Sequence, residues 1–123
     1  GGQLARMMQE EASALGVHLR ALVESPRGSA AQVTVDAPVG GADDEAAVRA
    51  LVAGRAATGP DAPSLQAAGA ADVLTFEHEH QDQELLLALQ GEGVPVRPDP
   101  RALLLARGVK PWVRMTGAIV TCC

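Results

Sequence analysis

The sequence is poor in aromatic residues and in cysteine. Its 123 residues include one Trp, one Phe and no Tyr, so aromatic side chains make up only 2% of the chain. The only cysteines are the adjacent Cys122 and Cys123, and adjacent cysteines cannot cross-link distant parts of a fold. This excludes a small secreted domain held together by disulfides. We predict that the two cysteines lie in a frayed terminus rather than in a redox site.

Basic charge and long apolar runs are scarce as well. Ten Lys and Arg residues stand against 15 Asp and Glu residues, and the net charge is −5. Proteins that bind nucleic acid generally carry a basic face, so we expect no nucleic-acid partner. No apolar run approaches the roughly 18 residues of a membrane span, and the opening Gly1-Gly2-Gln3-Leu4 does not resemble a signal peptide. We therefore expect a cytoplasmic protein with no membrane contact.

Small and apolar residues are abundant instead. The chain contains 23 Ala and 13 Gly, and 47% of its residues are hydrophobic. Its length suits one domain rather than two. A packed core is therefore possible. Because aromatic residues are so few, this core has to consist of Leu, Val and Ala, which bury little area per residue.

The first part of the chain alternates helical and extended patterns. Apolar residues recur at helical spacing over residues 4–15, and Gly16 follows as a stop signal. We predict that this stripe faces the core: Leu4, Met7, Met8, Ala12 and Leu15. Residues 17–23 predict a strand, residues 24–28 a turn, and residues 33–35 a second short strand.

A second helix is predicted next. Either Asp43 or Asp44 can cap it, its apolar stripe runs over residues 47–52, and Gly54 lies beyond its end. Residues 55–70 show no periodic pattern. Loops of this length are uncommon inside a compact domain, so we interpret this segment as an insertion.

The remaining segments continue the alternation. Residues 72–76 predict a strand, and residues 84–90 predict a Leu-rich helix that Gly91 ends. Residues 94–96 predict a strand whose central proline confines it to a sheet edge. One more helical segment is predicted over residues 101–106.

This order predicts an α/β fold in three layers, with helices on both faces of a parallel sheet. A glycine loop that begins a helix normally follows a strand, and no strand precedes Gly1 in this sequence. We therefore expect a Rossmann-like domain with its first strand missing. That strand would lie between residues 17–23 and residues 72–76. Both are expected to lose a hydrogen-bonded neighbour, and the chain is expected to be marginally stable.

Gly1, Gly2, Gln3 and Leu4 are the first candidate binding residues. They begin the first helix, where backbone N–H groups and the helix dipole attract an anion such as a phosphate. A plain tight turn is the alternative interpretation.

Glu77-His78-Glu79-His80 is the second candidate, and it follows the strand predicted over residues 72–76. His78 and His80 share one face of an extended chain, but no third ligand stands out, so we predict no metal site. A carboxylate at the carboxyl end of a parallel strand can accept hydrogen bonds from sugar hydroxyls. We expect Glu77 and residues 1–4 at the same edge of the sheet. The alternative is an ordinary polar loop.

Several segments taken together resemble one family. They are Gly-Gly-Gln-Leu-Ala-Arg-Met-Met at 1–8, Glu-Ser-Pro at 24–26, Ala-Ala-Gln-Val at 30–33, Asp-Val-Leu-Thr-Phe-Glu-His-Glu-His at 72–80, Glu-Leu-Leu at 84–86 and Gly-Val-Pro-Val-Arg-Pro at 93–98. In this order they are similar to segments of the 5-(carboxyamino)imidazole ribonucleotide synthases. The resemblance covers about residues 1–106, which we interpret as one pre-ATP-grasp domain with the insertion at 55–70. Residues 107–123 form a divergent tail.

The resemblance implies the amino-terminal, pre-ATP-grasp part of a purine-biosynthesis ligase. Members of the family use ATP, Mg²⁺ and bicarbonate to carboxylate 5-aminoimidazole ribonucleotide by way of carboxyphosphate. Carried over to this chain, Gly1, Gly2, Gln3 and Leu4 would face the phosphate or ribose of that substrate, and Glu77 would lie beside the ribose. A homodimer, as in the family, is also implied.

The family's ATP-grasp domain, with its ATP and Mg²⁺ ligands, has no counterpart in this sequence. Lys110 is the only lysine and lies in the tail. We therefore expect this chain to hold neither cofactor and to turn over no ATP by itself. Two other interpretations stay open: a stand-alone Rossmann-like module that binds a phosphate or nucleotide, and a truncated product without function.

Overall fold

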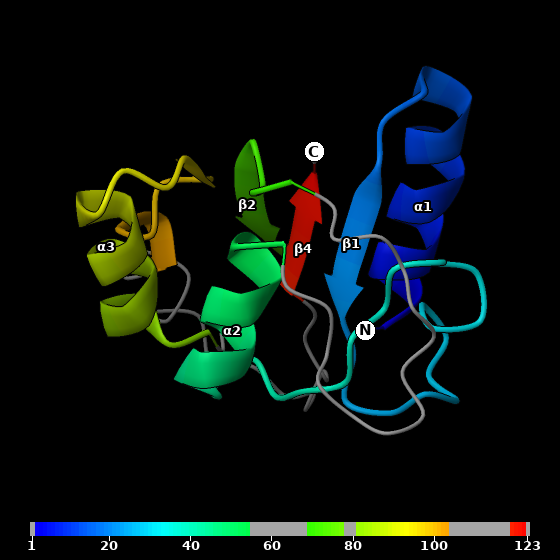
Figure 1. Cartoon of the computed structure of the whole chain (residues 1–123), viewed down its shortest axis with the longest axis horizontal. Helices are drawn as coiled ribbons and strands as arrows, with labels where there is room; N and C mark the ends of the chain where they lie inside the picture. Colours follow the sequence, from blue (N-terminus) through cyan, green and yellow to red (C-terminus); the bar gives the residue numbers. More distant parts are fainter. Residues whose placement is uncertain (1, 55–68, 78–80, 104–118, 123) are drawn as a thin grey trace.

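Helices cover both faces of a four-stranded sheet in the computed structural model of the chain, which describes residues 2–54, 69–77, 81–103 and 119–122 (Figure 1). The elements in these ranges are α1 (Gln3–Leu15), β1 (Leu19–Leu22), α2 (Glu45–Val52), β2 (Val73–Phe76), α3 (Gln83–Gly91), β3 (Val96–Arg97) and β4 (Ile119–Cys122). Within the same ranges no helix has both the length and the apolar character of a membrane span.

The sheet is mixed, with the strand order β1-β4-β2-β3. β2 pairs with β3 in parallel, while β4 pairs antiparallel with both β1 and β2. β1, β2 and β3 therefore run in one direction, as predicted. The prediction of an entirely parallel sheet is wrong, because residues 119–122 insert between β1 and β2 in the opposite direction. The predicted frayed terminus is wrong for Cys122, which pairs with Leu19 and Val73.

A short extended segment continues the sheet beyond β1. Asp36 and Val39 form isolated parallel bridges to Arg20 and Val23. The strand predicted over residues 33–35 is wrong, because the backbone N–H groups of residues 32–34 are used in turns that fold back on residues 28–30. Strand pairing therefore begins three residues later than the pattern predicts.

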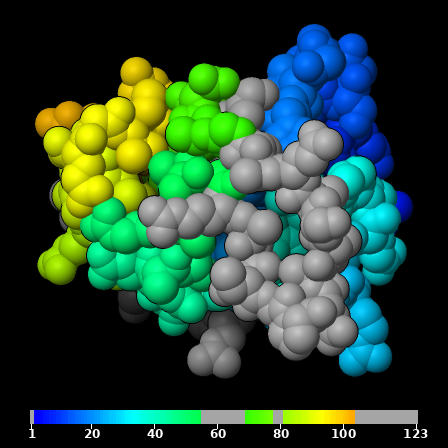
Figure 2. Space-filling view, viewed as in Figure 1, coloured from blue at the N-terminus to red at the C-terminus, as the bar shows by residue number. Residues whose placement is uncertain are grey.

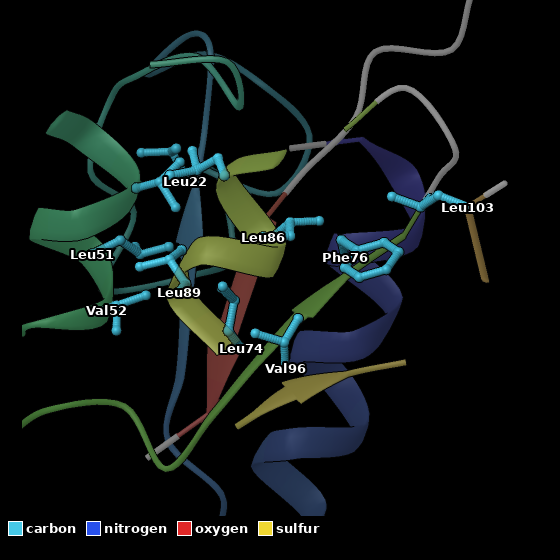
Figure 3. Packing of buried hydrophobic residues seen from close by; sticks show 11 residues of the cluster. Leu22, Leu51, Val52, Leu74, Phe76, Leu86, Leu89, Val96 and Leu103 are labelled. Atoms are coloured by element: carbon cyan, nitrogen blue, oxygen red, sulfur yellow. The ribbon is translucent and has the colours of Figure 1, made fainter. Parts of the chain in front are cut away.

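Two hydrophobic clusters lie on opposite faces of the sheet. The larger packs α2 and α3 against it (Figure 3). Its members are Leu22, Val48, Leu51, Val52, Leu74, Phe76, Leu85, Leu86, Leu89, Val96 and Leu103. The smaller packs α1 against β1 and consists of Ala5, Ala12, Leu19, Ala21, Val23 and Ala30. The predicted core of Leu, Val and Ala is confirmed, and the alanines gather on the α1 side.

Only part of the apolar stripe of α1 faces the core as predicted: Ala12 is buried, and Met8 packs against the smaller cluster. Leu4, Met7 and Leu15 have exposed fractions of 50%, 52% and 77%. Ala5 and Ala12 face β1, because their small side chains let the helix approach the strand closely. α1 lies at one end of the molecule (Figure 2), and its side chains Leu4, Met7 and Leu15 are exposed. The helix ends as predicted at Gly16, whose φ of 70° is left-handed.

The other two helices begin at aspartate caps. The carboxylate of Asp44, one of the two predicted candidates, accepts a hydrogen bond from the backbone N–H of Ala47 at 3.1 Å. Asp82 caps α3 in the same way. α3 ends at Gly91, where the sequence predicts the stop, and the left-handed residue Gly93, with a φ of 96°, follows two positions later. β3 lies at the sheet edge, as its proline predicts.

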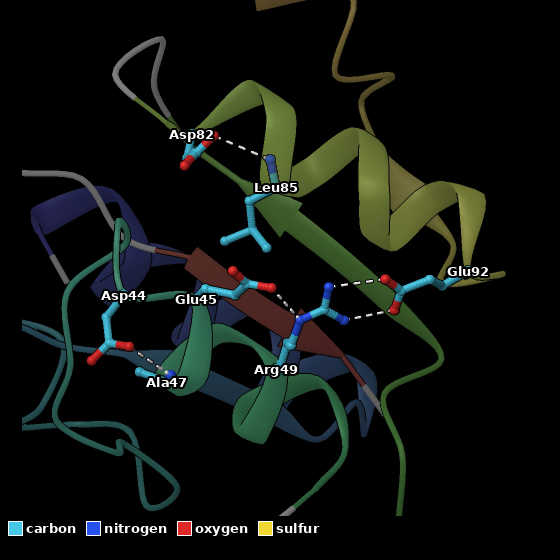
Figure 4. Close-up of polar contacts among 7 residues, drawn as sticks. All are labelled: Asp44, Glu45, Ala47, Arg49, Asp82, Leu85 and Glu92. Atoms are coloured by element: carbon cyan, nitrogen blue, oxygen red, sulfur yellow. Dashed lines mark hydrogen bonds and ion pairs between the residues drawn. The ribbon is translucent and has the colours of Figure 1, made fainter.

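Arg49 joins the ends of α2 and α3 (Figure 4). Its Nη1 and Nη2 donate to the two carboxylate oxygens of Glu92 at 2.6 and 2.9 Å, and its Nε donates to Glu45 at 2.7 Å. Hydrogen bonding to Glu92 and then to Glu45 raises the pKa of Arg49, and the hydrogen bonds from Arg49 lower the pKa of Glu92. The two-point contact fixes the orientation of the helices as well as their approach.

We expect Arg49→Gln to raise the pKa of the Glu92 carboxyl toward its ordinary value, because the cation that favours the ionised form is removed. A carboxyl with a lowered folded-state pKa stabilises the fold above its ordinary pKa, and this stabilisation is lost as the pH falls through the lowered value. The variant should therefore be less sensitive to acid than the parent chain. NMR titration of the Glu92 side chain measures the shift directly.

Arg101→Gln is the matched control for this experiment. Hydrogen bonds from Arg101 lower the pKa of Asp99 to about 2. Its replacement should raise the pKa of Asp99 and leave that of Glu92 unchanged. If both variants move Glu92 equally, the specific contact between Arg49 and Glu92 does not cause its shift.

Candidate functional site

The candidate site lies at the edge of the sheet where β1 and β2 end. Both strands run antiparallel to β4, so their carboxyl ends, Leu22 and Phe76, meet at the same edge. The amino terminus of α1 is held at this edge by a hydrogen bond from the Ser29 hydroxyl, in the loop after β1, to the Gln3 side-chain oxygen at 2.9 Å. The predicted common edge for residues 2–4 and Glu77 is therefore present in the structure.

The amino terminus of α1 is the first component. Gly2 is its N-cap residue, with φ −85° and ψ −165°, and no side chain caps the helix. α2 and α3 differ, because Asp44 and Asp82 supply carboxylates at their first turns. The first N–H groups of a helix have no acceptor inside the helix and carry a partial positive charge. This end of α1 is thus chemically suited to an anionic oxygen such as that of a phosphate.

Gln3 and Leu4 contribute differently to this terminus. The Gln3 side chain orients the loop after β1 through Ser29. Leu4 has a half-exposed apolar side chain and can offer an anion only its backbone N–H. Gly1 lies outside the described residues.

Glu77 is the second component, and it directly follows the last residue of β2. Its side chain is half-buried, and the carboxylate oxygen Oε2 is inaccessible to solvent. Its position follows from Phe76 and Leu74, which point into the larger cluster and set the strand's alternation. With Oε2 inaccessible, only the second carboxylate oxygen of Glu77 can accept a hydrogen bond from a ligand hydroxyl group.

β4 separates the two components. It lies between β1 and β2, and neighbouring strands are spaced by about 4.8 Å, so the ends of β1 and β2 are about 10 Å apart. A ligand that contacts both the α1 terminus and Glu77 must extend across the end of β4.

His78, Glu79 and His80 lie outside the described residues, so their predicted arrangement stays a prediction. Among the residues that the structure describes, no three His, Cys, Asp or Glu side chains come together as metal ligands. The inserted loop predicted at 55–70 is described only from residue 69, and the tail only over residues 119–122.

A buried ion pair inside the sheet was not predicted. Arg20 is 2% exposed, although its place in an alternating strand suggests a solvent-facing side chain. Its Nε donates to Asp36 Oδ2 at 2.6 Å, and its Nη1 donates to the Leu51 carbonyl at the end of α2 at 2.7 Å. His18 also contacts Asp36, at 3.3 Å. The only sequence signal was a cation within the apolar run of residues 17–23.

These observations define an α/β domain with a helix terminus that no side chain caps and a carboxylate at one sheet edge. The chain belongs to the ribonucleotide synthetase preATP-grasp domain family, whose model matches residues 1–107. The resemblance identified from the sequence segments is thereby confirmed.

Proteins similar to this chain are named as ribonucleotide synthases. The chain is 46% identical over 107 residues to the N5-carboxyaminoimidazole ribonucleotide synthase of Mycobacterium tuberculosis, covering 87% of this chain and 21% of that protein. It is 38% identical over 109 residues to the enzyme of that name from Corynebacterium ammoniagenes, covering 86% and 22%. The crystal structure of N5-carboxyaminoimidazole ribonucleotide synthetase from Thermotoga maritima matches with a TM-score of 0.67 and 32% identity, covering 85% of this chain and 25% of that one. The chain therefore spans about a fifth of the length of these relatives.

Proposed function

We propose that this chain is the amino-terminal part of an ATP-dependent ligase that carboxylates 5-aminoimidazole ribonucleotide with bicarbonate, and that this part helps to bind the ribonucleotide. Its family and the names of its relatives support this reaction. The observation that carries the binding role is the common sheet edge shared by the α1 terminus and Glu77.

Each component suits a different part of this substrate. The N–H groups at the start of α1 would hold the 5′-phosphate, since a phosphate gains from both the N–H donors and the helix dipole. The Glu77 carboxylate would accept hydrogen bonds from ribose hydroxyls. The arrangement has helices on both faces of a mixed sheet whose strands β1, β2 and β3 run in one direction, and it favours ligands at the carboxyl ends of these three strands.

We place ATP and Mg²⁺ in another part of the proposed ligase, because the family match covers only the preATP-grasp domain. Phosphoryl transfer requires carboxylate ligands for the metal and cationic groups around the transferred phosphoryl. Among the described residues no three metal-ligating side chains come together, and the carboxylates of the chain itself engage Arg20, Arg49 and Arg101. The ATP-dependent chemistry is assigned to the rest of the proposed ligase.

We expect titration with 5-aminoimidazole ribonucleotide to shift backbone amide NMR signals at residues 2–5 and at Glu77. Glu77→Gln should weaken binding by roughly tenfold, because a charge-assisted hydrogen bond to a ligand contributes about 1.5 kcal/mol or more. Isothermal titration measures this change. The corresponding riboside, which lacks the phosphate, should bind more weakly and leave the signals of residues 2–5 unchanged.

Glu10→Gln is the matched control, since Glu10 is an exposed carboxylate in the middle of α1. It should leave the affinity unchanged. Equal effects of the two substitutions, or signal shifts confined to another part of the chain, would contradict the proposed role. Equal affinity for ribose 5-phosphate and the full ribonucleotide would favour a general phosphate-binding module instead.

A further inference from the structure

β4 fills the gap between β1 and β2 in the centre of the sheet. Its four residues pair with all four residues of β1 on one side, and with all four residues of β2 on the other. β1 and β2 make no pair with each other in the described structure, so β4 alone connects the β1 half of the sheet with the β2–β3 half.

The position of β4 is unusual for the order of the other strands. Across the sheet, the segments that run in one direction are residues 36–39, β1, β2 and β3, with the gap between β1 and β2. Along the chain, the same segments follow the order β1, residues 36–39, β2 and β3. In doubly wound sheets with the order 3-2-1-4-5, the place between the second and fourth strands belongs to the strand that leads directly into the first helix. That strand runs parallel to its neighbours, and β4 does not.

The start of α1 fits such a parallel strand. The amino terminus of α1 lies at the edge where β1 and β2 end, held there through Gln3 and Ser29. A parallel strand in the central gap would end at this same edge and could continue into the helix through the two glycines. The backbone geometry around the gap therefore accepts a strand from the amino-terminal side as well as one from the carboxyl-terminal side.

We propose that residues 119–122 act as a substitute strand, which occupies a groove between β1 and β2 that also binds a parallel strand joined ahead of Gly1. The two strands exclude each other, because the groove has one row of hydrogen-bonding partners on each side. The domain therefore has two alternative ways to complete its sheet. This inference is independent of the proposed function, since it concerns which segment pairs with β1 and β2.

The residues of β1 and β2 on either side of the groove determine which kind of strand can bind between them. All four residues of β1 are buried, as are Leu74 and Phe76 of β2, so the strand between them must be extended and largely apolar. It must also offer backbone N–H and C=O groups on both edges. The sequence Ile119-Val120-Thr121-Cys122 meets this requirement, because it is short, uncharged and mostly β-branched. A Val- and Ile-rich segment ahead of Gly1 would meet it equally.

The test compares two substitutions in two backgrounds. Val120→Pro removes a backbone donor and is not tolerated in a central strand, whereas Val120→Ala keeps the N–H and serves as the matched control. Each is made in the chain as it stands and in a chain extended ahead of Gly1 by a six-residue Val- and Ile-rich strand. In the unextended chain we expect Val120→Pro to lower Tm by ~10 °C or more, and Val120→Ala to lower it by clearly less. In the extended chain Val120→Pro should have almost no effect.

Hydrogen exchange provides the second measurement. Backbone amides of residues 119–122 should be protected in the unextended chain, and the extension should accelerate their exchange by at least about tenfold as β4 leaves the sheet. The amides of β1 should stay protected in both chains. If Val120→Pro lowers Tm equally in both backgrounds, or if the extension leaves the exchange of residues 119–122 unchanged, the two strands do not compete and the proposal is overturned. A Val120→Pro chain that fails to fold alone but folds with the extension supports it.

Discussion

Replacing Arg20 by alanine is expected to lower the free energy of unfolding by about 3–5 kcal/mol. The Arg20 side chain is 2% exposed, so its ion pair with Asp36 is formed largely out of water. Without the guanidinium, the Asp36 carboxylate and the Leu51 carbonyl at the end of α2 each lose a charged hydrogen-bond donor. Loss of the long aliphatic stem adds a cavity between α2 and β1. Urea unfolding followed by far-UV circular dichroism measures the change.

Arg27→Ala is the control for Arg20, because Arg27 is exposed in the turn after β1. It should change the stability by no more than about 0.5 kcal/mol. Arg20→Lys tests the geometry, because an ammonium group cannot reproduce the donor pattern of the guanidinium. The free energy of unfolding of this variant should lie between those of Arg20→Ala and the parent chain. If Arg20→Ala destabilises no more than Arg27→Ala, the buried pair does not support the fold.

Leu86→Ala is expected to lower the free energy of unfolding by about 2–5 kcal/mol. Leu86 is 1% exposed and lies in the larger cluster, between α3 and the sheet (Figure 3). Removal of its isobutyl group forfeits the burial of apolar surface and leaves a cavity that a core of branched aliphatic residues only partly closes. Since Phe76 is the one aromatic residue of the described cluster, one leucine accounts for a large share of its buried area.

The adjacent Leu87 provides the matched control, because it is 37% exposed on the same helix. Leu87→Ala makes the same chemical change and should cost less than about 1 kcal/mol, with the slightly higher helix propensity of alanine acting in its favour. Both variants are compared by urea unfolding under identical conditions. Equal losses for the two positions would mean that α3 does not pack against the sheet as described.

Local sequence signals were sufficient for most of the regular elements. The stop at Gly16, the cap at Asp44 and the apolar strand over residues 73–76 depend on neighbours within a few positions, and these predictions are confirmed. The common edge of the α1 terminus and Glu77 also followed from alternation, because alternating helices and strands force parallel strands to end on one side. The binding roles of Gly1, Gly2, Gln3, Leu4 and Glu77 stay predictions.

Hydrophobicity alone misplaced the buried face of α1. Leu4, Met7 and Leu15 were predicted to face the core but are exposed, whereas Ala12 of the same stripe and Ala5 outside it pack there. Periodicity identifies an apolar stripe without deciding which half of it meets a neighbour. That choice depends on how closely the helix approaches β1, where Ala21 leaves room only for small side chains.

The sequence by itself determined the helices, three strands, their common direction and the family of this chain, because each rests on local patterns or on ordered motifs. Only the tertiary structure decided the burial of Arg20 and the pairing of residues 119–122. Arg20 is buried because Asp36 and the Leu51 carbonyl, which are 16 and 31 residues away, supply its partners. β4 is a strand because β1 and β2 leave unpaired backbone groups on facing edges, and a β-branched segment from the distant end of the chain satisfies both.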